Sequence, residues 1–235
     1  MATIQERLNK AREEINHSLT LMFRNISAIS LENLEDGTMN PYLIKGLGMP
    51  SVGDAIEFYV WQRVGRSVTT SFGSLFEKVI RIMTETEKGE WWDLVKETGE
   101  HASIKSGPRD MDKDQVIHFA REAKKLLAEN KNAKALLILA YGKVPFGLIS
   151  KYLKSEGLKP DETLIVGLKS VFKIFCNDPS LADKIIKILD EECKKVNGGN
   201  NLIKVINSKI KELKEEANKK YKNIDDLVKD LIGIK

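Results

Sequence analysis

The sequence predicts an α/β fold in which a mixed β-sheet is flanked by helices, and three observations support this prediction. Residues 90–96 and 100–106 each alternate roughly between apolar and polar side chains on either side of a short loop, a pattern typical of a β-hairpin. Residues 133–141, AKALLILAY, form an apolar run of strand length, which indicates a buried central strand. The segments around these strands carry apolar residues at helical spacing.

Helices are expected on the N-terminal side of the hairpin. Residues 3–30 show a helical spacing of apolar residues that is interrupted near His17, so one or two helices are predicted there. Residues 31–49 contain Asp-Gly, Asn-Pro and two further glycines and predict a turn-rich connection. Two more helices are predicted at residues 51–64 and 71–83, and the second has an apolar stripe that is expected to pack on the sheet.

The loop of the hairpin determines which side chains share a face of the sheet. Residues 97–99, Glu-Thr-Gly, predict a three-residue loop in which the glycine takes the left-handed position. This register places Asp93 opposite Ser103, so that Asp93, Ser103 and Lys105 lie on one face, and a shift of one residue would separate Asp93 from Lys105. The alternate residues lie on the other face, where a helix can cover them: Leu94, Ala102 and Ile104.

Helices are also expected after the hairpin. They are predicted at residues 112–130, 144–158, 164–176 and 180–195. Residues 201–235 predict a lysine-rich helix with a short apolar seam, which we expect to pack on the chain's own core and not to form an independent coiled coil. The seam residues are spaced three and four apart: Ile203, Ile206, Ile210, Leu213 and Ala217.

The composition is that of a folded protein. Hydrophobic residues make up 42% of the 235 residues and charged residues 31%, which excludes a disordered chain. The longest strongly apolar run, Ala135–Ala140, is far shorter than the roughly 20 residues that span a bilayer, and the charged N-terminus lacks the apolar core of a signal peptide. We therefore expect a cytoplasmic protein with no membrane segment. The net charge of +4 permits a polyanionic partner but does not require one.

The residues alone leave two interpretations of Asp93 and Lys105 open. They can form an exposed cross-strand ion pair, which would contribute under about 1 kcal/mol to stability. They can instead form a site at which an acid and an amine act together. An Asp followed by Ser-x-Lys is a common spacing in proteins, so the spacing by itself does not decide between them.

The segment SIKSGPRDMDKDQV, with WDLV before it, resembles the IKSGP segment of many type II restriction endonucleases of the PD-(D/E)XK nuclease superfamily. The resemblance covers roughly residues 35 to 195, and four further segments are similar in order and character: Asn40–Leu43, Phe72–Glu77, Tyr141–Lys143 and Phe175–Pro179. The family pattern has Asp or Glu two residues before the lysine; this chain has Ser103 there, as some restriction enzyme groups do.

The resemblance implies a restriction-endonuclease-like fold and a Mg²⁺ site. Asp93 would be the principal metal ligand, Glu77 a second and the backbone carbonyl of Ile104 a third, because Mg²⁺ prefers oxygen ligands. Lys105 would orient or deprotonate the attacking water, and the hydroxyl of Ser103 could hold a metal-bound water. Whether Ser103 or Glu77 completes the metal site is open. The implied organisation is an N-terminal helical region at residues 1–70, a catalytic nuclease core at 71–160 and a C-terminal helical region packed on it at 161–235.

Several polar residues are candidates for contacts to DNA. Lys and Arg can hold the DNA backbone, whereas Asp and Gln can read base edges. Arg63 and Arg66 flank Gly65 in an expected loop, for which a solvated surface is the alternative. His101 could touch a phosphate, act as a secondary base, or be a surface histidine without a role. The remaining candidates follow the lysine: Ser106, Arg109, Asp110, Asp112, Lys113 and Gln115.

The resemblance thus implies a type II restriction endonuclease that hydrolyses double-stranded DNA at a short specific sequence with Mg²⁺. A palindromic site implies a two-fold homodimer, and a companion DNA methyltransferase is implied as a functional partner. The alternatives are a structure-specific repair or junction nuclease of the same superfamily, a DNA-binding module without catalysis, and a helical interaction protein built on the C-terminal seam.

Overall fold

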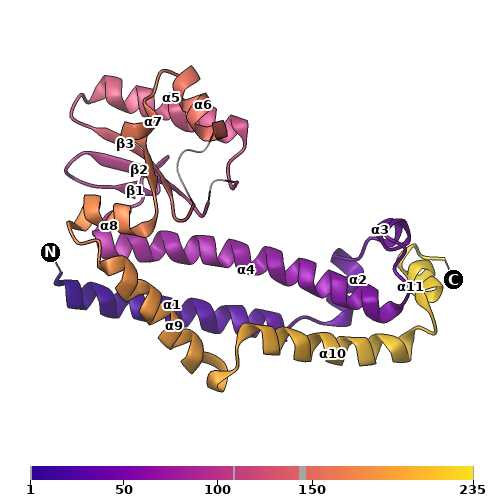
Figure 1. Cartoon of the computed structure of the whole chain (residues 1–235). Helices are drawn as coiled ribbons and strands as arrows, with labels where there is room; N and C mark the ends of the chain where they lie inside the picture. The colour runs from indigo at the N-terminus through magenta and orange to yellow at the C-terminus, as the bar shows by residue number, and fades with distance from the viewer. Residues whose placement is uncertain (1, 108, 143–146, 235) are drawn as a thin grey trace. The chain divides into compact units, whose positions relative to one another are not determined.

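The computed structural model describes residues 2–107, 109–142 and 147–234, and the chain divides into two compact units. One unit comprises Met1–Ile15 and Gly73–Asp190, and the other comprises Asn16–Phe72 and Glu191–Lys235. Contacts between segments far apart in the chain define both units. Three helices contribute residues to both: α1 (Ile4–Ser27), α4 (Val52–Thr84) and α9 (Leu181–Lys195) (Figure 1).

The first unit contains a mixed four-stranded sheet, which confirms the predicted α/β class. The strand order is β1-β2-β3-β4, and β1 runs antiparallel to β2 whereas β2, β3 and β4 are parallel. Parallel neighbours need a crossover connection, and helix α5 (Lys113–Glu129) connects β2 to β3. The strands are β1 (Leu94–Val95), β2 (Glu100–Lys105), β3 (Lys134–Leu139) and β4 (Leu164–Val166).

Helices cover both faces of this sheet (Figure 1). On one face, the side chains of Leu137 and Leu139 in β3 share a buried cluster with α5 and α6 (Gly147–Ser155). On the other face, Leu136 and Ile138 share a cluster with the end of α4 and with α8 (Leu168–Cys176). Because β3 is apolar on both faces, it is the buried central strand that its sequence predicts.

The predicted hairpin register is confirmed, although β1 is shorter than expected. Leu94 pairs with Ala102, Val95 pairs with His101, and the N–H of residue 96 donates to the carbonyl of Glu100 over 2.9 Å. Gly99 has a φ of +101° at the end of the loop, as the three-residue loop requires. Residues 90–93 are not strand, because the chain turns there and Val95 also bridges back to Glu87.

The two helices expected at residues 51–64 and 71–83 are a single helix, α4. The prediction of a loop around Arg63 and Arg66 was therefore wrong. Gly65 costs about 1 kcal/mol relative to alanine inside a helix, which is too little to end a helix whose apolar face continues past it.

The prediction of a turn-rich connection at residues 31–49 was also wrong in part. Asn40 is the N-cap of a helix whose first residue is Pro41, and Ser30 caps another: α3 (Pro41–Gly46) and α2 (Leu31–Gly37).

The helix expected at residues 164–176 begins only at Leu168. Residues 164–166 form β4, and Gly167, with a φ of +83°, turns the chain between strand and helix. Pro160–Thr163 form the short helix α7. Of the helix expected at 144–158, residues 147–155 form α6 and residues 156–158 are not helical. Val144 and the neighbouring Lys143, together with Pro108, lie outside the described residues.

The second unit is helical around one apolar core. The core joins the first residues of α4 to α2, α3, α10 (Leu202–Lys220) and α11 (Ile224–Leu231). Four residues of the predicted C-terminal seam, from Ile206 to Ala217, are buried in it, whereas Ile203 is exposed. A short 3-10 turn, η1 (Val196–Gly199), precedes α10. Across the described ranges, no helix combines the length and apolarity that crossing a membrane requires.

Candidate functional site

The hairpin and helix α5 enclose a cavity of about 200 Å³ on one face of the sheet of the first unit. Asp93, Ser103 and Lys105 all line it, which is the arrangement that the three-residue loop predicts. In the parallel pairing, Ser103 lies opposite Leu137 and Lys105 opposite Leu139, so this is the face that α5 covers. The cavity therefore lies between the hairpin and α5.

The carboxylate of Asp93 is held by the neighbouring strand. Its Oδ2 accepts a hydrogen bond from the backbone N–H of Ile104 over 2.7 Å. In an antiparallel pair the N–H and C=O of one residue point to the same edge, so the carbonyl of Ile104 also faces the edge on which Asp93 lies. A carboxylate and a backbone carbonyl are thus placed side by side without a second acidic residue in the strand.

Helix α5 supplies the opposite wall. Asp112 is its N-cap and accepts from the N–H of Gln115 over 2.9 Å, and the side chain of Gln115 accepts from the N–H of Asp112 over 3.4 Å. This capping box satisfies N–H groups of the first turn and defines where the helix begins. The wall is one helical face, with residues at i, i+3, i+4 and i+7: Gln115, His118, Phe119 and Glu122.

Six residues that line the cavity are not among the site residues predicted from the sequence, and Glu122 matters most because it adds a second carboxylate. His118 lies in the helix that the sequence predicts at residues 112–130, and Trp91 lies in the segment predicted as a strand. Trp91 is 58% exposed, and its ring lies 5.8 Å from that of His118. The sequence does show that Glu122 lies on the same helical face as Gln115. It does not show that this face packs against the hairpin, because that depends on tertiary packing.

A second tryptophan separates His101 from the cavity. Trp92 makes edge-to-face contacts with His101 at 5.7 Å and with Phe119 at 5.8 Å between ring centroids. His101 shares the sheet face of Ser103, yet it is not among the residues that line the cavity, and its Nδ1 lies 3.2 Å from the carbonyl oxygen of Gly99. The aromatic contacts therefore stiffen the hairpin against α5.

Glu77 is not among the residues that line the cavity. It lies on α4, and its Oε1 is 3.6 Å from Nη2 of Arg81 and 3.8 Å from Nζ of Lys88. Ile80 of the same helix packs on the sheet face that carries Leu94, which is opposite to the face of Asp93. The structure thus brings Glu122, and not Glu77, to the cavity.

The residues after Lys105 mostly shape the chain between β2 and α5. Asp110 accepts a hydrogen bond from the N–H of Gly107 over 2.8 Å, and Ser106 lies beside Gly73 of α4. The ammonium of Lys113 lies 5.7 Å from the ring centroid of Tyr152, a cation–π geometry. Arg109 is exposed. Gln115 is the one predicted DNA-contacting residue after Lys105 that lines the cavity. The others do not line it: Ser106, Arg109, Asp110, Asp112 and Lys113.

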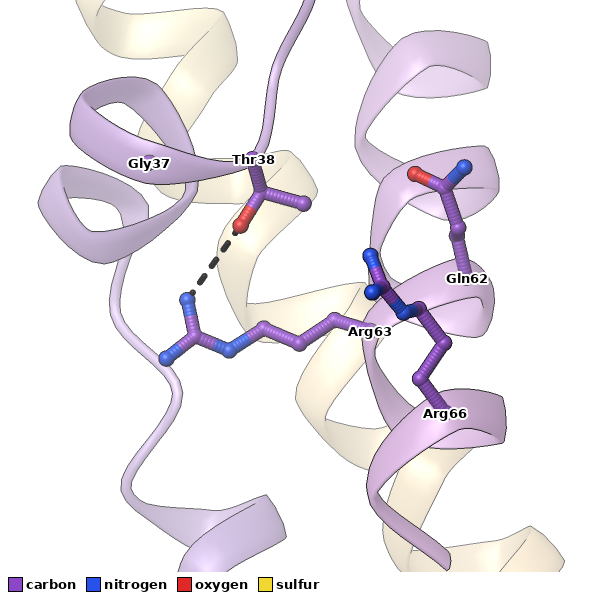
Figure 2. A pocket seen from close by; sticks show the side chains of 5 residues that line it. All are labelled: Gly37, Thr38, Gln62, Arg63 and Arg66. Carbon is purple, nitrogen blue, oxygen red and sulfur yellow. Dashed lines mark hydrogen bonds between the residues drawn. The ribbon is translucent and has the colours of Figure 1, made fainter. Parts of the chain in front are cut away.

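Arg63 and Arg66 belong to the second unit. Both lie on α4 and line a separate pocket of about 270 Å³ with Gln62, Gly37 and Thr38 (Figure 2). The two arginines were expected together, and the structure brings them together, but on a helix and not on a loop.

The donors around Asp93 suit a hard divalent cation. Within residues 2–107, 109–142 and 147–234, no group of three or more His, Cys, Asp and Glu side chains could hold a metal ion. Mg²⁺, however, usually takes one or two protein carboxylates and completes its shell with water and substrate phosphates. Asp93 and Glu122 line the cavity, and the Ile104 carbonyl faces the same strand edge as Asp93, so the types of oxygen donor that such an ion prefers are present here.

No protein-family model matches this chain, and no curated protein matches its sequence.

Proposed function

We propose that this protein is a Mg²⁺-dependent type II restriction endonuclease that hydrolyses phosphodiester bonds of double-stranded DNA at a short specific sequence. The observation that carries the proposal is that Asp93, Ser103 and Lys105 line one cavity while the Ile104 amide holds the carboxylate of Asp93. The order of hairpin, helix and parallel strand supports a restriction-endonuclease-like architecture, in keeping with the resemblance of the IKSGP segment.

Hydrolysis forms a bond from a water oxygen to phosphorus and breaks the bond from phosphorus to the leaving oxygen, which takes up a proton. Asp93 and Glu122 would hold the cation, with the Ile104 carbonyl as a neutral third donor. When bound, Mg²⁺ supplies Lewis acidity toward the phosphate and the water. Glu122 takes the place that the resemblance gave to Glu77, because Glu122 lines the cavity.

Lys105 is the amine of the site. Placed on the same strand face as Ser103, it can orient the attacking water, take up its proton in the neutral form, or neutralise the charge that develops on the phosphate. Ser103 has no charge to contribute, but its hydroxyl can hydrogen-bond a water in the cavity. The two residues thus act on the water and on the phosphate, while the carboxylates act on the cation.

Cutting both strands of a palindromic site requires two copies of the site related by a two-fold axis, so we propose a homodimer on DNA. A chain that cuts a short sequence would also cut the DNA of its own cell. A methyltransferase that modifies the same sequence is therefore the functional partner that the proposal requires.

The test is digestion of plasmid DNA by the full chain, with Mg²⁺ or with a chelator. We expect discrete bands with Mg²⁺ only. Asp93→Ala and Lys105→Ala should still bind DNA but no longer cut it, while Lys134→Ala, which removes an exposed lysine of β3 paired with Glu100, should cut normally.

Other outcomes would replace the proposal. DNA binding without cutting under any divalent ion would indicate a binding module that lacks catalysis, as Ser103 in the acidic position would favour. Cutting that depends on branches or ends and not on sequence would indicate a repair or junction nuclease. Absence of DNA affinity even at low salt would indicate a helical interaction protein.

A further inference from the structure

The second unit has a polar pocket whose lining carries positive charge only. It lies between the end of α2 and the exposed side of α4, with a volume of about 270 Å³. Its side chains are those of Thr38, Gln62, Arg63 and Arg66, and the chain passes it at Gly37 (Figure 2). None of the described residues that line it is acidic, so two guanidinium groups share a cavity that has no carboxylate in its lining.

Arg63 is fixed in place by its neighbours. It reaches from α4 to α2, where its Nη1 donates to the carbonyl of Asn33 over 2.9 Å. The same nitrogen lies 3.4 Å from Oγ1 of Thr38, which follows α2 (Figure 2). These contacts engage one nitrogen of a group that has five N–H donors. They also tie the guanidinium to the first turn of α2 through the carbonyl of Asn33, so its position is set before any ligand binds.

Arg66 is the uncompensated charge of the pocket. It lies one turn after Arg63 on α4, so the two cations are neighbours on one helix surface and repel each other. In the part of the chain that the structure describes, the side chains of Arg66 and Gln62 have no hydrogen bond or ion pair. An anion between the two guanidinium groups would remove the repulsion and accept from both.

The donors suit a tetrahedral oxyanion. Guanidinium groups bind phosphate through paired N–H donors, and the amide of Gln62 and the hydroxyl of Thr38 can add neutral donors. The pocket has room for several water molecules, whose share of liquid volume is about 30 Å³ each, and hence for a phosphate group.

We propose that the pocket of Arg63 and Arg66 binds a phosphate group, and that on DNA this group belongs to the backbone. The assignment to DNA rests on the proposed nuclease function, whereas the phosphate chemistry rests on the pocket alone. Such a contact carries no base information, so it anchors DNA of any sequence to the second unit, and the residues of the cavity in the first unit remain responsible for cutting.

The test uses the full chain with Arg66→Gln, which removes the charge and keeps a polar side chain. Arg24→Gln is the matched control, because Arg24 is an exposed arginine of the same unit that does not line the pocket. Binding of a labelled duplex of random sequence is measured in a chelator, so that no cutting occurs. We expect Arg66→Gln to bind about tenfold more weakly at low salt, and its plot of log affinity against log salt to be shallower by about 1.

Inorganic phosphate is the second probe. Titration should shift the Nε–H resonances of Arg63 and Arg66 in the wild type, and the shift of Arg63 should be lost in Arg66→Gln but kept in Arg24→Gln. Unchanged DNA binding and unchanged phosphate shifts in Arg66→Gln would overturn the inference, even if the protein cuts DNA. Phosphate shifts without any DNA binding would support the pocket, overturn its assignment to DNA and count against the nuclease.

Discussion

The carboxylate of Asp93 accepts a hydrogen bond from the backbone N–H of Ile104 over 2.7 Å. This bond ties the residue before β1 to the strand that carries Ser103 and Lys105. The bond engages Oδ2 of the carboxylate, and Oδ1 is left available to a ligand in the cavity. The acid therefore has two separable properties: it is the acceptor that holds the hairpin edge, and it is the negative charge of the proposed metal site.

Asp93→Asn separates these two properties. The amide oxygen can still accept from the Ile104 N–H, so the thermal stability should change little, whereas the loss of charge should abolish Mg²⁺-dependent cutting. Asp93→Leu should in addition leave the Ile104 N–H unpaired and lower the free energy of unfolding by about 1–3 kcal/mol. Cleavage assays and urea denaturation of both variants check this. Full cutting by the Asn variant would contradict the proposed site.

Glu122→Gln tests which carboxylate joins Asp93. Because Glu122 lines the cavity and Glu77 pairs with Arg81 and Lys88, only Glu122→Gln should raise the Mg²⁺ concentration needed for half-maximal cutting, by about tenfold or more. Glu77→Gln is the matched control and should need the same Mg²⁺ concentration as the wild type. The reverse ranking would restore the assignment made from the resemblance alone.

The part of the site that depends on the local sequence pattern, the register of the hairpin, could be predicted from the sequence. The alternation of residues 93–95 and 101–105 and the glycine at position 99 were sufficient for the register, because a one-residue shift would have exposed Leu94 and Ala102. Glu122 could not be found in this way. Its approach to the hairpin depends on how α5 packs, which no spacing within the helix encodes.

The errors in the fold have similar physical causes. Strand β4 is only three residues long, and its residues Leu164–Val166 are apolar like the start of the helix that follows. The spacing of apolar residues alone could therefore not distinguish the strand from the helix. The sequence pattern predicts a break at Gly65 and another at Pro41. The glycine is tolerated inside α4, and the proline begins α3 at the helix position where proline loses nothing.

Gly99→Ala tests the turn that determines the register. At a φ of +101° an L-residue is strained, so the variant should lower the free energy of unfolding by about 1–2 kcal/mol. Gly147→Ala, at the start of α6 with no atom near an added Cβ, should be neutral or slightly stabilising. Urea denaturation of both variants makes the comparison. Equal stability of the two would mean that the loop relaxes without cost.

Tyr221 ties the C-terminal helices of the second unit together. Its hydroxyl lies 2.7 Å from Oε1 of Glu35 and 2.5 Å from Oδ2 of Asp230, and Lys220 donates to Glu35 over 2.8 Å. Burial, followed by the hydrogen bond to Asp230, raises the pKa of Tyr221 above its ordinary value. The hydrogen bond from Tyr221 in turn lowers the pKa of Asp230. Residues of α2, α10 and α11 thus meet at one phenol.

Tyr221→Phe should therefore lower the free energy of unfolding by about 2 kcal/mol near neutral pH, because the buried ring stays but the one O–H donor that faces the two carboxylates is lost. Since the pKa of Asp230 is lower in the folded state, its contribution is present above the unfolded-state value of about 3.9 and is lost as the pH falls through the folded-state value. The difference between wild type and variant should thus shrink as the pH falls below about 4. Urea denaturation across this range measures it, with Tyr42→Phe, an 80% exposed tyrosine of the same unit, as the control. A difference that stays constant with pH would show that Asp230 does not depend on the phenol.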